Sequence, residues 1–287
     1  MKISGAARLA GVMGWPVAHS LSPRLHGLWL DRYGIDGAYV PLAVRPDRFE
    51  AAFRALSALG FRGANVTIPH KETAFALCDS LSDRARAIGA VNTLVVDADG
   101  RISGDNTDAF GFVENLREDA KRTGAFAGPA LVLGAGGAAR AIVHGLLAEG
   151  VTEVRLANRT RARAEVLAKD FGSAVRVVDW PAGPAACADA TLAVNTTSLG
   201  LDGSGMEPLL AMLPHLSPAA LVTDIVYKPL ITPFLAAARS RGHTVVDGLG
   251  MLLHQARPGF EAWFGVAPQV TPDIRATILS ELGEADA

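Results

Sequence analysis

The chain has 287 residues, which corresponds to about two domains of roughly 150 residues each. Hydrophobic residues make up 49% of the chain and charged residues 20%, which excludes a disordered protein, because disorder requires low hydrophobicity and high net charge. The formal net charge of −2, without long runs of lysine and arginine, argues against a protein whose main task is to bind nucleic acid.

Missing sequence features exclude further classes. The two cysteines, Cys78 and Cys187, form no C-x-x-C pair, so we expect neither a disulfide scaffold nor a thiolate zinc site. No His, Cys, Asp and Glu grouping has metal-ligand spacing, and we expect no metal. Residues 1–9 lack a signal-peptide core, and no apolar stretch approaches the ~18 residues of a membrane span. The sequence therefore predicts a cytoplasmic protein that binds neither membranes nor nucleic acid.

Apolar strands alternate with amphipathic helices along the chain, which is typical of an α/β protein with mainly parallel sheets. In the first part, strands are expected near residues 12–13, 38–44, 63–68 and 92–96, and helices over 25–33, 48–59 and 109–120. Further on, strands are expected at 131–133, 153–157, 175–178, 192–195, 221–226 and 244–246, with a helix to about residue 147. The last stretch, 249–264 and 272–282, is expected to be helical without strands.

A glycine-rich turn follows the apolar strand 131–133. Gly134, Gly136 and Ala139 fit G-x-G-x-x-A, in which the glycines permit a tight turn and close approach of a pyrophosphate, and the small alanine permits close helix–strand packing. The helix start then offers free N–H groups to phosphates. A glycine-rich turn selected only for packing is the alternative. The context of strand, turn, helix and second strand favours a Rossmann-type dinucleotide site.

The end of the second strand indicates which dinucleotide. NAD sites place an acidic residue there, whereas this chain has Asn158, Arg159 and Thr160, with Arg163 close behind. Arg159 can stack on adenine and pair with a 2′-phosphate, which a carboxylate would repel. The alternative is a solvated basic helix start. We expect NADP rather than NAD.

Polar residues in the first half suit a small polyhydroxylated ligand. Lys71 and Asp108 offer a cation beside a carboxylate, a pair that can position and tune a proton donor for a carbonyl group. Each also has a structural alternative, since Asp108 could cap a helix, Lys71 could be solvated, and Ser22 could cap the helix that Pro23 begins. His19 and His70 are interpreted as structural residues or as residues that support the site without touching the ligand. The remaining candidates are Ser20, Thr67 and Asn92.

With these motifs the chain resembles the shikimate dehydrogenase family. The resemblance rests on nine segments in order: His19 to Pro23, Asn65 to Lys71, Gly89 to Thr93, Gly104 to Asp108, Gly134 to Ala139, Asn158 to Thr160, Asn195 to Gly200, Asp224 to Pro229 and Asp247 to Ala256. It implies NADPH-dependent reduction of 3-dehydroshikimate to shikimate in the shikimate pathway of aromatic amino-acid and chorismate biosynthesis. It also implies two α/β domains around a cleft: a substrate-binding domain at 1–108, completed by helices in 249–287, and a Rossmann-type NADP-binding domain at 109–248.

The resemblance also implies a role for each matching residue. Lys71 and Asp108 would be catalytic. Substrate contacts would come from Ser20, Ser22, Thr67, Lys71, Asn92, Asp108, Tyr227 and Gln255. Cofactor contacts would come from Asp83, Gly134, Ala135, Gly136, Gly137, Ala138, Asn158, Arg159, Thr160, Arg163, Ile225, Gly248 and Met251.

Two positions depart from the family pattern, and two functional alternatives stay open. His254 and Lys228 stand where the family more often has other residues, which leaves fine substrate preference open. One alternative is a relative that acts on quinate or prefers NAD; Ser22 in place of threonine and the basic 158–160 stretch count against it. The other is a non-catalytic NADP-binding regulatory module, which would have no need of Lys71 and Asp108. A monomer and a homodimer are both compatible with the sequence.

Overall fold

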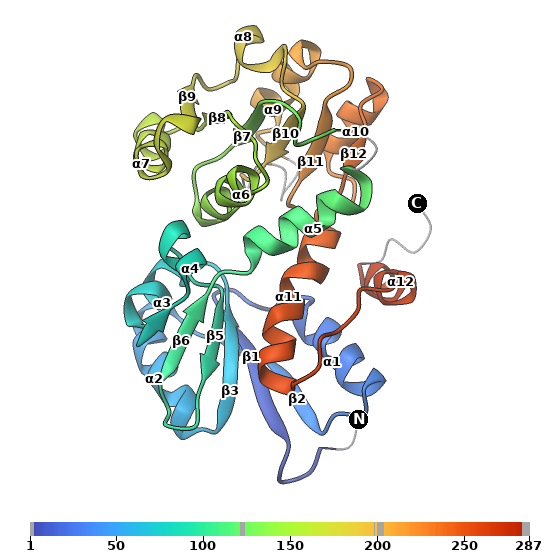
Figure 1. Ribbon diagram of the computed structural model, residues 1–287. Coiled ribbons are helices and arrows are strands. Elements are labelled where there is room, and N and C mark those ends of the chain that lie inside the picture. The colour runs from blue at the N-terminus through green and yellow to red at the C-terminus, as the bar shows by residue number, and fades with distance from the viewer. Residues whose placement is uncertain (1–2, 121–123, 198, 200–203, 283–287) are drawn as a thin grey trace. The chain divides into compact units, whose positions relative to one another are not determined.

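The computed structural model describes residues 3–120, 124–197, 199 and 204–282. The chain divides into two compact units, each built around a six-stranded sheet (Figure 1). Unit 1 comprises residues 1–108 and 252–287, and unit 2 comprises residues 109–251. The chain thus leaves unit 1 after Asp108 and returns to it at Leu252. Unit 2 ends at Met251, three residues after the boundary expected at 248. In the described ranges no helix is both long and apolar enough to span a membrane.

The sheet of unit 1 is mixed. Its strands are β1 (Arg8–Gly14), β2 (Gly37–Ala43), β3 (Phe61–Val66), β4 (Ser80–Leu81), β5 (Thr93–Val96) and β6 (Ile102–Asp105), in the order β2-β1-β3-β5-β6-β4. Three of its five ladders are parallel, as expected for a mainly parallel sheet. The β5–β6 hairpin supplies the antiparallel pairings, with β3 and within itself. The short strands β4 and β6 were not among the expected elements.

This pairing gathers several chain segments at one edge of the sheet. Strands β1, β3 and β6 run in the same direction and end at that edge, and the antiparallel strand β5 begins there. The register sets Asn65 opposite Thr93 and Thr93 opposite Asp105. The residues that follow β3 and β6 and precede β5 therefore meet, although they are far apart in sequence.

Helices cover both faces of this sheet (Figure 1). They are α1 (Ser22–Arg32), α2 (Phe49–Ala58), α3 (Lys71–Leu77), α4 (Asp83–Ile88), the unit 1 part of α11 (Leu249–Phe264) and α12 (Pro272–Glu281). Phe49, Phe53 and Leu56 of α2 pack in a core beneath β1, β3 and β5. The aromatic residues of α1 and α11 pack together, and Trp263 donates to the Leu94 carbonyl at 2.8 Å. The terminal helices therefore complete the core of unit 1.

The sheet of unit 2 is entirely parallel in its observed pairings. Its strands are β7 (Ala130–Leu133), β8 (Val154–Ala157), β9 (Val175–Val178), β10 (Leu192–Asn195), β11 (Leu221–Asp224) and β12 (Val245–Val246), in the order β12-β11-β10-β7-β8-β9. The helices are α5 (Asp108–Ala120), α6 (Gly137–Ala148), α7 (Arg161–Phe171), α8 (Pro184–Cys187), α9 (Glu207–Met212) and α10 (Pro233–Ser240).

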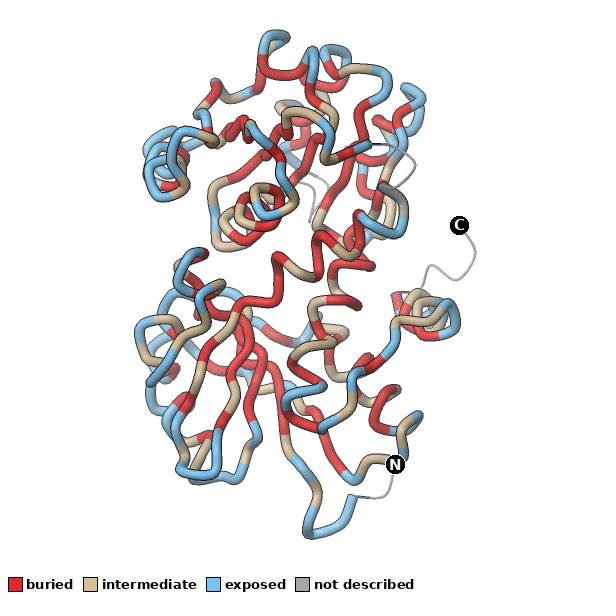
Figure 2. Tube along the Cα trace, viewed as in Figure 1, coloured by how far each residue is buried: buried red, intermediate tan, exposed pale blue. Residues whose placement is uncertain are grey.

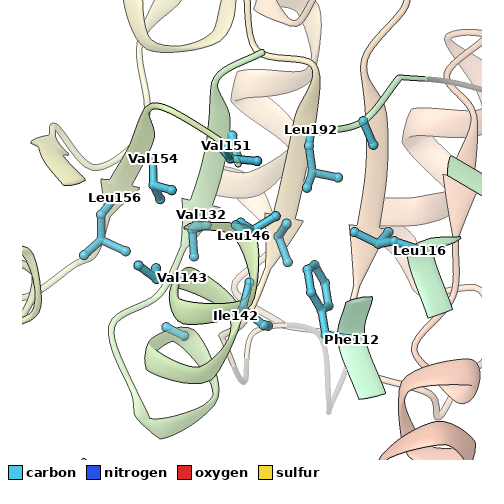
Figure 3. Packing of buried hydrophobic residues seen from close by; sticks show 14 of the residues in the cluster. Phe112, Leu116, Val132, Ile142, Val143, Leu146, Val151, Val154, Leu156 and Leu192 are labelled. Carbon is cyan, nitrogen blue, oxygen red and sulfur yellow. The ribbon is translucent and has the colours of Figure 1, made fainter. Parts of the chain in front are cut away.

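The four central strands of unit 2, β7, β8, β10 and β11, are buried on both faces, because one apolar core lies on each side of the sheet (Figure 2). One core joins Phe112 and Leu116 of α5 to Ile142 and Leu146 of α6 (Figure 3). The first strand of the unit, β7, lies at the centre, and the strand order reverses between β7 and β10. In doubly wound sheets, ligands bind beyond the carboxyl ends of the strands at that reversal. The expected α/β architecture with a Rossmann-type domain is confirmed.

Candidate active site and cofactor site

Lys71 and Asp108 meet at the strand edge of unit 1. Lys71 is the first residue of α3, after the turn that follows β3, and Asp108 is the first residue of α5, after β6. Because β3 and β6 end at the same edge, the two helices start close together, and Lys71 Nζ forms an ion pair with Asp108 Oδ2. Their side chains are 19% and 8% exposed. Lys71 is therefore not a solvated lysine, and Asp108 does more than cap a helix.

Asn92 joins the pair from the start of β5. Its Nδ2 donates to the other oxygen of Asp108 at 2.8 Å and lies 3.5 Å from Oε1 of Gln255. Its Oδ1 accepts from the backbone N–H of Thr107 at 2.8 Å. Four of the residues predicted to bind substrate therefore form one hydrogen-bonded group in unit 1.

The two serines lie at the beginning of α1. Ser22 is the first residue of the helix rather than its cap, and the described residues provide no side-chain cap there, so the capping interpretation is wrong. The Ser22 side chain is buried and hydrogen-bonds to the Tyr39 hydroxyl. The Ser22 N–H also donates to Ser20 Oγ at 3.3 Å.

Thr67 and the two histidines also lie near this edge. The Thr67 N–H donates to the Met13 carbonyl at 2.9 Å, and its methyl group occupies the space that a side chain at Gly14 would need. His70 is buried, with Nε2 2.7 Å from the Val44 carbonyl. His19 is exposed. The contacts of His70 are those of a structural residue.

In unit 2 the glycine-rich turn lies where the strand order reverses. Gly134 has a φ of +115°, which L side chains rarely adopt, and a Cβ atom there would collide with Thr196, directly after β10. A Cβ atom at Gly136 or Gly137 would meet no described heavy atom within 4 Å. Ala139 is completely buried against the core. Gly134 is thus required by the fold, whereas Gly136 and Gly137 border open space.

Helix α6 begins in that open space. None of the described side chains caps its N-terminus, so its first N–H groups are free to meet an anion. Gly136 is exposed and Ala135 and Ala138 are half-buried, which leaves the backbone accessible. This arrangement fits the pyrophosphate of a dinucleotide.

The basic residues after β8 fall into two groups. Arg161 is engaged by carboxylates, 2.9 Å from Glu165 and 3.2 Å from Asp179. Arg159 and Arg163 are exposed and have no carboxylate partner among the described residues. Asn158 and Thr160 lie beside them, and Asn158 Nδ2 donates to the Thr160 carbonyl at 2.8 Å. Arg159 and Arg163 are therefore the cations free to pair with a 2′-phosphate.

The remaining predicted cofactor residues lie on two different elements. A Cβ atom at Gly248 would approach the Ile225 carbonyl oxygen to 2.5 Å, so only glycine lets these segments meet. Met251 is buried in the unit 2 core, against which Ile225 packs. Asp83, by contrast, is an exposed residue of α4 in unit 1, 3.7 Å from Arg86.

Tyr227 and Lys228 lie in unit 2, after β11. Burial raises the pKa of the Tyr227 hydroxyl, so it remains a protonated donor at neutral pH. Lys228 is exposed. In unit 1, His254 is buried, with Nδ1 3.4 Å from Arg257 Nη1. Within the motif 195–200, Ser198 and Gly200 lie outside the described residues.

Sequence reasoning missed the buried polar residues behind both sites. In unit 1, the missed residues Tyr39, Asn65, Thr93 and Thr107 support Asn92. In unit 2, Asp224 accepts from Asn195 at 3.1 Å and Thr232 at 2.8 Å, and burial raises the pKa of its carboxyl group. The signal that could have found them is a polar residue inside an otherwise apolar strand, as at Asn65.

Comparisons with known proteins agree with this geometry. Three family models match: the shikimate dehydrogenase substrate-binding domain over residues 12–94, shikimate/quinate 5-dehydrogenase over 120–198, and the C-terminal domain of shikimate 5′-dehydrogenase over 248–278. The shikimate dehydrogenase (NADP+) of Paramagnetospirillum magneticum is 58% identical over 279 residues, covering 97% of this chain and 100% of the relative.

Two solved structures show the same fold with different ligands. Shikimate 5-dehydrogenase of Thermus thermophilus, in complex with NADP(H) and shikimate, is 37% identical with a TM-score of 0.82, over 96% of this chain and 99% of that one. Quinate dehydrogenase of Corynebacterium glutamicum, in complex with NAD, is 30% identical with a TM-score of 0.86, over the same shares. From its domains, architecture and identity to these proteins, the chain belongs to the shikimate dehydrogenase family.

Proposed function

We propose that this chain is an NADP-dependent shikimate dehydrogenase, which reduces 3-dehydroshikimate to shikimate reversibly within aromatic amino-acid biosynthesis. The observation that carries the proposal is the Lys71–Asp108 ion pair at a strand edge lined with hydrogen-bonding groups. A proton donor next to a carbonyl is what ketone reduction requires of the protein. A non-catalytic NADP-binding module would have no use for it.

Lys71 supplies the proton. NADPH, once bound, would supply the hydride that adds to the carbonyl carbon. Negative charge then builds on the ketone oxygen, where the Lys71 ammonium stabilises it and donates its proton. Asp108 holds the ammonium in place, and Asn92 holds Asp108 through its second oxygen. In the reverse direction Lys71 accepts the hydroxyl proton of shikimate.

The other polar residues bind and orient the substrate. Ser20 and Ser22 hold its carboxylate, which suits two neighbouring hydroxyls at a helix start. Its ring hydroxyls contact Thr67, Asn92, Tyr227 and Gln255. Holding a rigid ring at both ends fixes the ketone relative to Lys71, and such positioning accounts for much of an enzyme's rate.

The cofactor residues belong mainly to unit 2. The turn 134–138 at the start of α6 would hold the pyrophosphate, and Arg159 and Arg163, together with Asn158 and Thr160, would hold the 2′-phosphate. Ile225, Gly248 and Met251 contact the nicotinamide end, and Asp83 contributes from unit 1. We also propose that the enzyme works in the reducing cytoplasm, with which the free thiols of Cys78 and Cys187 are compatible.

Steady-state kinetics with four substrate and cofactor pairs tests this proposal. We expect kcat/KM to be highest for shikimate with NADP, and lower by about tenfold or more when either quinate or NAD is substituted. NAD lacks the 2′-phosphate, and the ring of quinate differs from the shikimate ring to which the proposed contacts are matched. A preference for quinate with NAD would contradict the proposal and assign the chain to the quinate dehydrogenase branch of the fold.

A further inference from the structure

The hydrogen bonds behind Asn92 form a chain with a defined direction. Asp108 is a carboxylate and can only accept, so Asn92 must present its Nδ2 to it, at 2.8 Å. The Oδ1 of Asn92 therefore faces the other way, where it accepts from the Thr93 hydroxyl at 2.9 Å. Thr93 has thus used its proton on Asn92, and its oxygen is left to accept.

Asn65 is the next residue in this chain of hydrogen bonds. Its Nδ2 donates to Thr93 Oγ1 at 3.2 Å and to the backbone carbonyl of Asn92 at 3.0 Å, both of which are acceptors. The Oδ1 of Asn65 consequently points to Tyr39, whose hydroxyl donates to it at 2.6 Å. The Asn92 carbonyl and the Thr107 N–H hold the two amides in these same orientations, so the direction of every bond from Tyr39 to Asp108 is defined.

Tyr39 is built to be the fixed donor at the far end. Its side chain is buried, and its ring stacks on His26 at 3.9 Å with an interplanar angle of 1°. Burial raises the pKa of its hydroxyl well above 10, so the hydroxyl keeps its proton at any pH at which the enzyme works. Its proton goes to Asn65 Oδ1, and the Ser22 side chain is its other hydrogen-bond partner.

We propose that Tyr39 is a positioning residue of the active site: its buried hydroxyl anchors the far end of the hydrogen-bond chain that runs through Asn65, Thr93 and Asn92 to the Lys71–Asp108 pair. Without that hydroxyl, Asn65 Oδ1 loses its donor, so fewer contacts hold the Asn65 amide and the Thr93 hydroxyl bonded to it in place, although the Thr107 N–H still fixes the orientation of Asn92. Because Tyr39 also binds Ser22, one side chain links the two groups of substrate residues in unit 1. This inference rests on the proposed function.

The test is a double-mutant cycle on the oxidation of shikimate by NADP. Tyr39→Phe removes the hydroxyl and keeps the stacked ring, and we expect kcat to fall about tenfold, with a smaller change in KM, because the reacting pair is misplaced rather than lost. Thr93→Val breaks the chain at its middle and should lower kcat to a similar extent. If the residues act in series, the double variant loses no more than about twofold beyond Thr93→Val.

Matched variants separate positioning from folding. Thr93→Ser keeps the hydroxyl and should retain kcat within about twofold of the wild type, and so should Tyr33→Phe, which removes a tyrosine hydroxyl elsewhere in unit 1. The Thr93→Val and Thr93→Ser pair tests the chain even if Tyr39→Phe does not fold, because equal rates for both would overturn the proposal.

Two results decide against the inference alone. Wild-type kcat in a folded Tyr39→Phe variant would overturn it, and so would losses that multiply to about a hundredfold in the double variant, since multiplied losses indicate independent action. An inactive wild-type enzyme would instead remove the proposed function, and this inference with it.

Discussion

The two candidate sites are built in opposite ways. In unit 1 the functional groups are buried and paired: Lys71 with Asp108, and Asp108 with Asn92. In unit 2 they are open and unpaired: Gly136 borders empty space, the start of α6 is uncapped by described side chains, and Arg159 is without a carboxylate partner among the described residues. A site that moves a proton arranges its groups against one another beforehand, whereas a site for a large anion leaves its donors for the ligand.

The largest expected effect comes from breaking the paired site. Replacing Lys71 by alanine removes the proton donor and leaves Asp108 buried without its cation, so we expect kcat with 3-dehydroshikimate and NADPH to fall about 10²-fold or more. The exposed Lys169→Ala variant on α7 is the control and should keep wild-type rates. Retention of wild-type kcat in Lys71→Ala would show that the paired site does not perform the chemistry.

Two neighbouring glycines sharpen the contrast within the open site. Gly136→Ala fills space that is empty of described protein atoms, so unfolding free energy should change by less than about 0.5 kcal/mol while the Kd for NADP rises about tenfold, because the phosphate can no longer approach the backbone. Gly134→Ala strains a φ of +115° and should cost about 1–3 kcal/mol of stability. Chemical denaturation and NADP titration measure both, and a stable Gly134→Ala variant is the contrary result.

Paired and unpaired arginines give the next test. Arg159→Ala should raise KM for NADP about tenfold and leave KM for NAD within twofold, because only NADP carries the 2′-phosphate. Arg161→Ala is the matched control: its guanidinium is already held by Glu165 and Asp179, so both KM values should stay near wild type. Equal effects of Arg159→Ala on the two cofactors would exclude a 2′-phosphate contact.

A further effect concerns pH and the aromatic core of unit 1, where it changes stability and not turnover. Burial lowers the pKa of His26 from 6.5 to about 3, and its ring nitrogens have no hydrogen-bond partner among the described residues. On acidification the unfolded chain therefore binds a proton at His26 before the folded chain does. The contribution of His26 to the unfolding free energy is fully present above pH 6.5 and is lost as the pH falls from 6.5 toward 3.

Between pH 7.5 and pH 5 the shifted pKa of His26 lowers the unfolding free energy by about 2 kcal/mol. His26→Phe should flatten that part of the pH dependence, whereas replacing the exposed His19 by glutamine should leave it as in the wild type. Denaturation at the two pH values measures the difference. An unchanged slope in His26→Phe would contradict the assignment to His26.

The sequence predicts local motifs better than it predicts what supports them. Gly134, Gly136 and the 158–160 stretch could be interpreted directly, because turn conformation and charge are local properties, and the parallel sheet of unit 2 followed from its regular strand–helix alternation. Lys71 and Asp108 could be named as a pair from their chemistry. Their contact depends on strands β3 and β6 ending at one edge, and β6 was not foreseen because it lies within a motif rich in Gly, Asp and Asn.

Long-range partners could not be predicted for a physical reason. Ser22 was interpreted as a possible helix cap from the following proline, but tertiary packing gives its hydroxyl to Tyr39 on a neighbouring strand. Likewise, nothing near Asn92 in the sequence indicates that Tyr39 and Asn65 lie behind it. Sheet register sets these contacts, and register is a property of the whole sheet rather than of one segment.

The consumption of NADPH by the wild-type enzyme with 3-dehydroshikimate tests the account most directly. We expect NADPH absorbance to fall in proportion to the 3-dehydroshikimate supplied, with shikimate as the product, and to stay constant when the Lys71→Ala variant replaces the wild type over the same time. A folded wild-type protein that binds NADPH but consumes none with 3-dehydroshikimate would contradict the account.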